Sequence, residues 1–475
     1  MARDTQLERR CSSASIEGIS MGAQIRRRGS ALAAGALGVS LALAACGGGS
    51  SGGNAAASTN SDPTCSKYSA YFGHSGKTVT MFASIISPES DSLAKSWADF
   101  ERCTGIKISY QGSNNFESQL TVQVAGGNPP DIAFIPQPGL LQKMVKSGKV
   151  SKPPQAVVDN VDKYWNKAWK AYGTVNGTFY SAPMSANMKS MVWYSPKAFK
   201  AAGYTVPTTW ADLMTLSDKI AASGTTKPWC GGIGSGTATG WPATDWLEEI
   251  VLGNQGGDVY DKWVNHDVKF SSPEITQAMT TLAGWMKNPK YVNAGFGDVK
   301  SIATTTFQDA GKPILTGKCA MLQQASFYGA QWPKGTKVGP DGDVMAFYLP
   351  GSNPSIQTPV EGGGEFATAF ASRPEVQAVQ SYLSSPDWHS SRVKVATGWV
   401  SANSGVDKSL YTDPVDQLSA KYLTDPNATF RFDASDLMPA AVGAGSEWKE
   451  MTAWFSSDKP TADVLKAIDA AWPAK

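Results

Sequence analysis

Short apolar runs alternate with segments of helical spacing in the first third of the chain, and this alternation constrains the fold more than any other feature. The apolar runs have the length of buried strands and cover Lys77–Ile86, Ile106–Tyr110 and Pro130–Ile135. The segments that follow them repeat apolar residues at helical spacing and cover Asp91–Cys103, Asn115–Val124 and Leu140–Lys146. Strands that alternate with helices predict an α/β lobe with a mostly parallel sheet.

The chain is too long for one such lobe. Without the proposed signal segment, residues 1–45, 430 of the 475 residues remain, which favours two hydrophobic cores. Two segments are typical of crossings between lobes: Phe179–Tyr194, with two strand-like stretches around a polar centre, and the glycine-rich Glu361–Phe366. The predicted lobes are residues 77–186 plus about 362–402, and residues 187–361 plus about 403–475.

The amino terminus indicates export. Arg26–Arg28 precede the apolar run Ala31–Ala45, as in a signal peptide, and Met21 is an alternative start. The following Leu43-Ala44-Ala45-Cys46 resembles the lipobox of bacterial lipoproteins, which implies a diacylglycerol on the Cys46 thiol. Residues 46–76 would then form a flexible tether. The alternative is an ordinary secreted protein in which Cys46 is incidental.

Four cysteines remain after Cys11 and Cys46 are set aside, an even number for an oxidising compartment. Two disulfides are expected. Three pairings exist, and we favour Cys65 with Cys103, which flank the first strand and helix, and Cys230 with Cys319, which both fall in the second lobe. A zinc site is disfavoured because these cysteines lack Cys-x-x-Cys spacing.

Charge and composition favour a neutral ligand. Removing the six basic and three acidic residues of the first 45 from the totals of 42 and 40 leaves 36 basic and 37 acidic residues, without basic blocks. This balance gives no electrostatic footprint for nucleic acid. The chain also contains 16 Trp, 15 Tyr and 17 Phe, which favours a ligand with flat apolar surfaces.

Several motifs together resemble the large-sugar branch of ABC-importer binding proteins, the group with maltose- and trehalose-binding members. The similarity covers most of residues 77–475 and rests first on Gly126–Ile132, Trp193–Ser195 and Gly203–Trp210. Gly240–Glu248, Gly317–Met321 and Ser435–Pro439 resemble the α-glucoside-binding members. Cys319 departs from the pattern, because maltose-binding relatives have a stacking Trp there.

This resemblance implies a two-lobed periplasmic-binding-protein-like fold of the α/β class, with a ligand cleft between the lobes. It implies a lipid-anchored monomer outside the cytoplasmic membrane that captures a neutral oligosaccharide, an α-glucoside or a related sugar, and delivers it to the transmembrane subunits of an ABC permease. No catalytic residue, cofactor or metal is expected.

A sugar site needs aromatic plates and planar hydrogen-bonding side chains. Trp241 and Trp246 bracket Asp245 after a glycine-rich turn, and core packing is the alternative interpretation for both tryptophans. Trp399 follows Gly398 in a segment where the family has cleft residues; a core role is again the alternative.

Further candidates come from turns. Asn114, Asn115 and Phe116 stand at a helix entry, where Asn also serves as a cap, and Gln137 follows a predicted strand at its carboxyl end. Gly364 and Glu365 lie at the second crossing, where hinge flexibility is the alternative role. Asp436 would accept hydrogen bonds from sugar hydroxyls or cap a helix.

Other functions have weaker support. The glycine-rich Gly232–Gly240 lacks the Lys-Ser/Thr ending of a P-loop, so we interpret it as a turn of small residues. Glu248 and Glu249 are adjacent on a helix, which favours a solvated face over a glycosidase pair. The main alternative function is a secreted glycan-active hydrolase, and a sensor or adhesion lipoprotein is a third.

Overall fold

The fold is taken from a computed structural model that describes residues 62–292 and 297–474. The expectations for the signal segment and for Cys46 lie outside the described residues. Within them, the predicted tether ends earlier than expected, because Pro63–Tyr71 forms a 3-10 helix (η1) against the helix α2 (Ala98–Thr104). Cys65 and Tyr68 of η1 are buried, and a disulfide holds the helix in place.

The first sheet has five strands in the order β2-β1-β3-β13-β6. These are Lys107–Gly112, Thr78–Ala83, Ile132–Ile135, Phe366–Ala369 and Ser181–Pro183. The strands β1, β2 and β3 are parallel, as the sequence predicts, but β13 runs antiparallel to both β3 and β6. The strands β6 and β13, which lie at the two segments that cross between the lobes, therefore make this sheet mixed rather than mostly parallel.

Helices cover both faces of this sheet and form two apolar clusters with it. The helices of this part are α1 (Glu89–Lys95), α2 (Ala98–Thr104), α3 (Phe116–Ala125), α4 (Pro138–Lys146), α5 (Gln155–Tyr164), α6 (Lys167–Tyr172), α13 (Pro374–Leu383) and α14 (Pro386–Val393). The helix predicted over Asp91–Cys103 is interrupted at Trp97, whose side chain is buried in the core. A short hairpin joins β4 (Thr174–Val175) to β5 (Thr178–Phe179).

The second sheet has four strands in the order β11-β8-β10-β9, and it is also mixed. These are Met345–Tyr348, Met191–Tyr194, Cys319–Gln323 and Lys227–Trp229. The helices of this part are α7 (Pro196–Ala202), α8 (Trp210–Ala222), α9 (Trp241–Gln255), α10 (Gly257–Val264), α11 (Pro273–Met286), α12 (Phe307–Ala310), α15 (Pro414–Leu423), α16 (Ala434–Leu437), α17 (Trp448–Ser456) and α18 (Thr461–Ala470).

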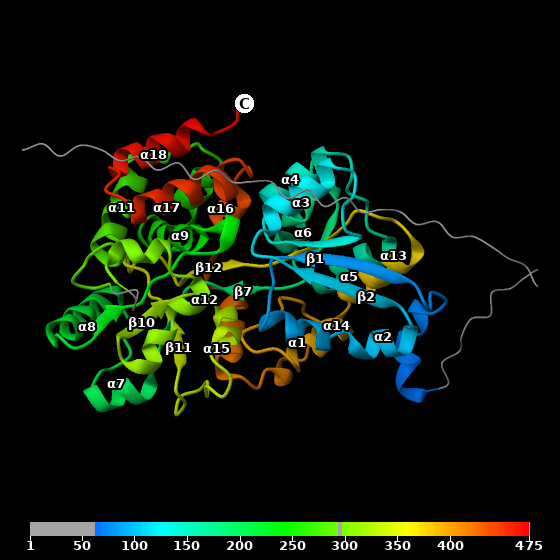
Figure 1. The fold of residues 1–475 in the computed structure, drawn as a ribbon, viewed down its shortest axis with the longest axis horizontal. Coiled ribbons are helices and arrows are strands. Elements are labelled where there is room, and N and C mark those ends of the chain that lie inside the picture. Colours follow the sequence, from blue (N-terminus) through cyan, green and yellow to red (C-terminus); the bar gives the residue numbers. More distant parts are fainter. Residues whose placement is uncertain (1–61, 293–296, 475) are drawn as a thin grey trace, which may run out of the picture. The chain divides into compact units, whose positions relative to one another are not determined.

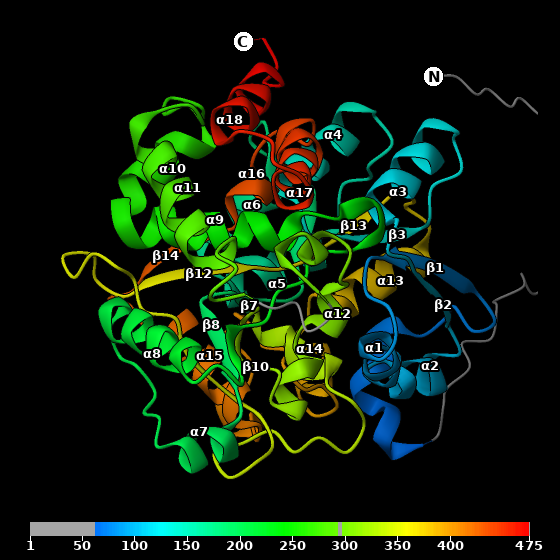
Figure 2. The ribbon, with the colours of Figure 1, turned by 60° about the vertical axis from the view of Figure 1, so that its left-hand side comes forward.

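A small third sheet connects the two parts. Its strands are β14 (Thr429–Phe432), β12 (Pro359–Gly363) and β7 (Asn187–Met188), in that order. Figure 1 shows β7 and β12 between the group that contains β1 and β2 and the group that contains β10 and α9, and Figure 2 keeps the two groups apart. The two-lobed α/β fold is as predicted. The exact lobe boundaries stay a prediction.

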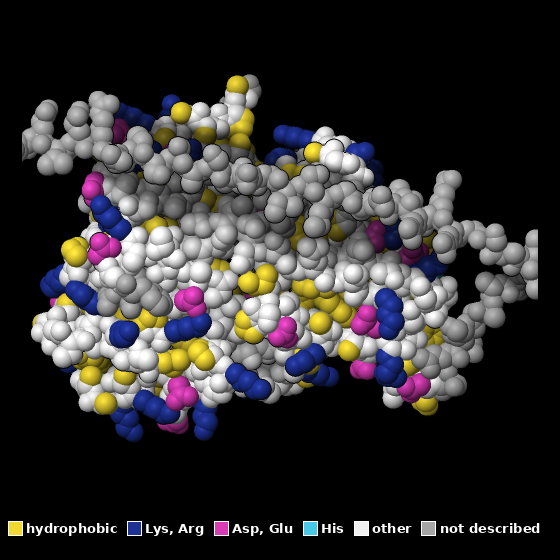
Figure 3. Space-filling model, in the orientation of Figure 1, with side chains coloured by type: hydrophobic (Ala, Val, Ile, Leu, Met, Phe, Trp, Pro, Cys, Tyr) yellow, Lys and Arg dark blue, Asp and Glu magenta, His cyan; other side chains and the backbone are white. Residues whose placement is uncertain are grey.

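Both favoured disulfides are present, Cys65–Cys103 and Cys230–Cys319. Cys319 is therefore buried and bonded where the maltose-binding relatives are expected to stack a Trp. On the face drawn in Figure 3, basic and acidic side chains are interspersed rather than gathered in patches. Among the described residues, no helix combines the length and the apolar character needed to cross a membrane.

Candidate functional site

A cavity of about 130 Å³ lies where segments from both lobes meet. The carboxyl ends of four strands lead into its wall: Ser84–Ile86 follow β1, Pro136–Gln137 follow β3, Gly364 and Glu365 follow β12, and Asp433 follows β14. Loops at the carboxyl ends of strands are the usual binding region of open α/β sheets. The topology therefore brings residues that are distant in sequence into one site.

The lining is both aromatic and polar. Its aromatic side chains are Trp241, Phe307, Phe327 and Trp448, and its carboxyl side chains are Glu89, Glu117, Glu365, Asp433 and Asp436. The ring of Trp241 packs edge-on against Phe307, with centroids 5.1 Å apart, and lies 5.9 Å from Phe327. Because this contact fixes the orientation of the Trp241 ring, one wall of the cavity is a rigid aromatic surface.

Gly240 explains how Trp241 reaches the cavity. It precedes α9 with φ of 117°, a conformation that side chains disfavour. A Cβ atom at this position would lie 2.2 Å from the carbonyl oxygen of Trp448. Only glycine fits this turn, which places the first residue of α9 at the cavity.

Six of the predicted ligand residues line the cavity: Asn114, Gln137, Trp241, Gly364, Glu365 and Asp436. Gln137 is buried, and its Nε2 donates to Glu117 Oε1 at 3.2 Å. Its Oε1 and the Oδ1 of neighbouring Asn187 are buried without a hydrogen-bond partner among the described residues. Buried acceptors of this kind cost free energy until a donor reaches them.

Five predicted ligand residues do not line the cavity. Trp246 lies in the core with its ring 5.5 Å from Phe455, because five positions along α9 turn it about 140° away from Trp241. Phe116 packs against Phe82 in the core below α3. Trp399 is buried beside Trp388 and His389.

The two polar residues among these five, Asn115 and Asp245, form hydrogen bonds to other parts of the protein. Asn115 Oδ1 accepts a hydrogen bond from the backbone N–H of Thr237 at 3.1 Å, so it connects α3 to the turn Gly236–Ala238. Asp245 is buried behind the cavity wall, where its Oδ1 accepts from Lys189 Nζ at 2.8 Å. Gly232–Gly240 forms a turn of small residues, as predicted, and this turn carries the partner of Asn115.

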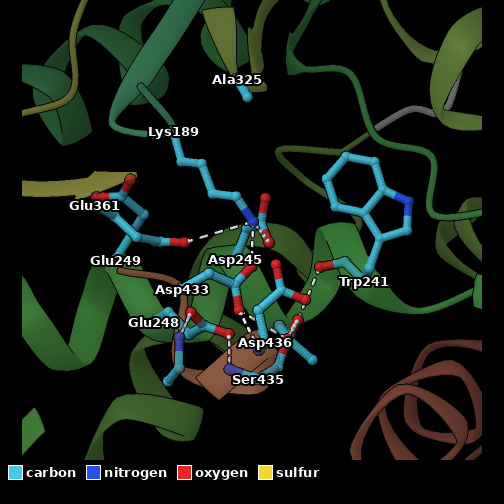
Figure 4. Close-up of polar contacts among 12 residues, drawn as sticks. Lys189, Trp241, Asp245, Glu248, Glu249, Ala325, Glu361, Asp433, Ser435 and Asp436 are labelled. Atoms are coloured by element: carbon cyan, nitrogen blue, oxygen red, sulfur yellow. Dashed lines mark hydrogen bonds and ion pairs between the residues drawn. The ribbon is translucent and has the colours of Figure 1, made fainter. Parts of the chain in front are cut away.

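Lys189 is the cation of the cavity wall (Figure 4). Its ammonium contacts Asp245 and Asp433, and Glu361 lies 4.0 Å away. Burial lowers the pKa of Lys189, but the attraction of these carboxylates outweighs burial and holds the pKa well above its ordinary value. Lys189 therefore stays charged.

The carboxyl groups around Lys189 outnumber it. Burial raises the pKa of Asp245 to about 7, although Lys189 acts in the opposite direction. Burial also holds the pKa values of Glu248, Glu361, Asp436 and Glu447 well above the ordinary range. Part of this cluster therefore remains protonated near neutral pH, so its carboxyl groups can donate as well as accept hydrogen bonds.

The interpretation of Glu248 and Glu249 as a solvated helix face is wrong, since both side chains are buried. Glu248 accepts hydrogen bonds from the backbone N–H groups of Ala434 and Ser435, at 2.5 and 3.1 Å, and from the hydroxyl of Tyr260 at 3.0 Å. Glu249 accepts from Ser190 Oγ at 3.0 Å. These bonds connect α9 to the segments after β14 and β7.

The first lobe supplies its own carboxyl groups. Burial raises the pKa of Glu365 to about 7 and also raises that of Glu89. The buried guanidinium of Arg392 lies 3.9 Å from Glu89. Glu365 is further held by Ser185, whose Oγ accepts from the Glu365 backbone N–H at 2.8 Å and donates to its carboxylate.

Several lining residues were not predicted from the sequence: Glu89, Glu117, Lys189, Phe307, Phe327, Asp433 and Trp448. Most of them stand in no recognisable local motif. Glu117 carried a usable signal, since it lies in the first turn of the helix that the predicted Asn114 and Asn115 precede. Asp433 would have been found if the strand Thr429–Phe432 had been recognised.

The model of the family "Bacterial extracellular solute-binding protein" matches residues 87–388. The chain is 36% identical over 412 residues to the alpha-glucosides-binding periplasmic protein AglE of Rhizobium meliloti, covering 84% of this chain and 87% of that protein. It is 32% identical over 400 residues to the osmoprotective compounds-binding protein GgtB of Synechocystis, covering 84% and 93%.

Solved structures agree on the fold. The galactopyranose receptor AcbH superimposes with a TM-score of 0.72 at 18% identity, covering 84% of this chain and 98% of that one. The maltose-bound MalE3 of T. maritima gives a TM-score of 0.63 at 19% identity, covering 83% and 98%. Family match, sequence identity and fold agree that the chain belongs to the bacterial extracellular solute-binding proteins.

Proposed function

We propose that this protein is the lipid-anchored receptor of an ABC sugar importer and that it captures an α-glucoside or a related neutral oligosaccharide in the cavity between its lobes. The carrying observation is that two residues of the cavity lining, Gln137 and Asn187, have buried amide oxygens that accept no hydrogen bond from the described residues. An unpaired buried acceptor costs about 1–3 kcal/mol, and ligand hydroxyls would remove this cost.

The rest of the lining fits a sugar. A pyranose ring has an apolar CH face that packs on an aromatic plate such as Trp241, and a rim of hydroxyls that bonds to planar acceptors. Glu365 and Asp436 supply such acceptors from opposite lobes.

The α-linkage is inferred from similarity. The Rhizobium relative is named for α-glucosides, and 36% identity extends over most of both chains. The loss of the expected stacking Trp at Cys319 fits a sugar preference that differs from that of the maltose-binding relatives.

Similarity to known proteins supports capture rather than hydrolysis. The named relatives and structural neighbours are binding proteins. In this proposal, contacts from both lobes favour the closed form, and the transmembrane subunits of the permease recognise that form of the monomer.

Calorimetric titration tests the ligand assignment. The purified protein should bind at least one of maltose, trehalose, sucrose or a longer α-glucan at one site, and bind the β-linked cellobiose at least tenfold more weakly. Sugar analysis of the same samples should detect no cleavage product. Cleavage would support the hydrolase alternative, and tighter binding of cellobiose would reject the α-glucoside assignment.

The lipid anchor has a separate test at Cys46, which lies outside the described residues. Cells fed radiolabelled palmitate should label the protein, and Cys46→Ala should abolish labelling and move the protein from the membrane to the soluble fraction. Cys11→Ala is the matched control and should change neither result. Labelling that survives Cys46→Ala would reject the anchor.

A further inference from the structure

Lys189 stands where the three strands of the connecting sheet meet. It directly follows β7, while Glu361 belongs to β12 and Asp433 directly follows β14. Its backbone is also fixed, because Lys189 N donates to the carbonyl oxygen of Glu361 at 2.9 Å and Gln323 Nε2 donates to the carbonyl oxygen of Lys189 at 2.9 Å. The backbone from which the Lys189 side chain extends is therefore held in a fixed position.

Carboxylates of the protein surround the ammonium and accept two hydrogen bonds from it. An ammonium carries three donors. Lys189 Nζ bonds to Asp245 Oδ1 at 2.8 Å and to Asp433 Oδ2, and Glu361 Oε1 lies 4.0 Å away. The side chain is only 6% exposed, although it contributes to the cavity wall. The same ammonium lies 5.5 Å from the ring centroid of Trp241.

Asp433 connects Lys189 to the cavity wall through hydrogen bonds. While Oδ2 accepts from Lys189, Oδ1 accepts from the backbone N–H of Asp436 at 2.8 Å and from Ser435 Oγ at 2.9 Å. Asp433 is thus the N-cap of α16, the short helix that carries Asp436 to the cavity. A buried capping carboxylate that loses its counter-charge is no longer stable in place and rearranges.

We propose that Lys189 is a positioning residue for ligand capture: it holds Asp433, the capped α16 with Asp436, and the face of Trp241 in the geometry that binds the ligand. Its place among β7, β12 and β14 also means that the ligand-binding wall is fixed to the strands that connect the lobes. The identity of the ligand used below rests on the proposed function, whereas the positioning role does not.

A crystal structure of the ligand-free Lys189→Met variant tests this role directly. Met keeps most of the volume of the lysine stem and removes the charge. The proposal predicts that Asp433 and α16 leave their positions and that the Trp241 ring tilts, while the disulfide Cys230–Cys319 and β10 stay in place. An unchanged Asp433 and Trp241 would overturn the proposal, whichever sugar the protein binds.

Binding measurements supply the functional test. For the tightest α-glucoside of the calorimetric panel, Lys189→Met should raise the dissociation constant about 30-fold, and Lys189→Arg should stay within about threefold of the native protein. Lys197→Met is the matched control, because Lys197 forms an exposed ion pair with Asp343 away from the cavity, and it should leave the dissociation constant unchanged.

A double-mutant cycle separates positioning from a general structural effect. If Lys189 acts through Asp433, Lys189→Met and Asp433→Asn together should weaken binding much less than the product of their single effects. Independent, multiplicative effects would overturn the proposal.

The pH dependence gives a second readout. The groups that face the ammonium are Asp245, Glu248 and Glu249 of α9, Glu361 of β12, and Asp433 and Asp436 at α16. Burial raises the pKa of Asp245 to about 7 against the opposing effect of Lys189, so without Lys189 this carboxyl group takes up its proton at higher pH, and binding by Lys189→Met should vary less between pH 6 and 8 than native binding. An identical pH profile in both proteins would contradict the proposal.

If Lys189→Met does not fold, Asp245→Asn is the variant that tests the same proposal. Asp245 lies outside the cavity lining, and Asn keeps the hydrogen-bonding shape while it weakens the hold on Lys189. We expect about fivefold weaker binding with Asp433 displaced. Unchanged binding and an unchanged Asp433 would again overturn the proposal.

Discussion

At the scale of single residues, Trp241 and Trp246 of α9 have different roles although they share a helix. Trp241 lines the cavity and Trp246 is 1% exposed in the core. We predict that Trp241→Ala weakens sugar binding about 10- to 100-fold with little loss of stability, because it removes an aromatic plate of the cavity.

Trp246→Ala is the opposite case. It should lower the free energy of unfolding by about 3–5 kcal/mol, since it leaves a hole in the core, and change affinity little wherever the protein stays folded. Calorimetry and thermal unfolding of both variants check the pair. The reverse pattern would place the ligand against Trp246.

The buried carboxyl group of Glu249 predicts a pH dependence of stability. Burial raises its pKa from 4.5 to about 8, so the folded state keeps a proton that the unfolded chain releases. The stabilisation from this group is complete below about pH 4.5 and is lost as the pH rises towards 8. The loss is on the order of a few kcal/mol.

Glu249→Gln should therefore flatten the fall in unfolding temperature between pH 5 and 8 and make the variant more stable than the native protein at pH 8. Glu274→Gln, at a partly exposed position of α11, is the control. Thermal unfolding across this pH range measures the effect. A slope equal to that of the native protein would contradict the assignment.

These residues also show where the sequence was informative. Local signals were enough for Trp241 after its glycine-rich turn, for Gln137 after β3 and for Glu365 at the crossing. They were not enough for Glu248, whose partners Ala434 and Ser435 come from a distant part of the chain. Burial of a charged group depends on such partners, so its position in a helix pattern could not predict it.

At the scale of elements, α3 and the turn Gly236–Ala238 form a direct contact between the lobes. Asn115 Oδ1 accepts from Thr237 N at 3.1 Å, and the hydroxyl oxygens of Ser118 and Thr237 lie 3.4 Å apart. Asn115 therefore contacts protein where the sequence suggested a ligand. This contact stabilises the arrangement in which both lobes surround the cavity.

Asn115→Ala should accordingly weaken the binding of every sugar by the same factor of about five, mainly through faster dissociation, because one hydrogen bond is worth about 1 kcal/mol. Stopped-flow measurements with two different sugars check this. Asn128→Ala, at an exposed position beyond the other end of α3, is the control. An effect that depends on the sugar would instead mean that Asn115 contacts the ligand.

Elements with regular local patterns were predicted well, and elements set by distant pairing were not. The strands β1, β2 and β3 and the helices α3 and α4 lie close to their expected ranges. The antiparallel pairing of β13 and the strand β14 were missed, because both depend on partners that only the crossings bring together. The break at Trp97 reflects core packing that overrides helical spacing.

At the scale of the whole molecule, length, alternation and family motifs predicted two α/β lobes with a cleft, and the cysteine count predicted both disulfides. The cavity itself could not be predicted as a set of contacts, since its wall combines the ends of β1, β3, β12 and β14 with α9 and α16. Its chemistry, aromatic faces beside carboxyl and amide groups, supports capture of a neutral sugar.

The most direct test of this account is a crystal structure of the protein grown with its tightest α-glucoside. We expect an intact sugar in the cavity, with one ring face on Trp241 and hydroxyls bonded to Gln137, Asn187 and Asp436. A sugar bound elsewhere, or a cleaved sugar in the cavity, would contradict the account.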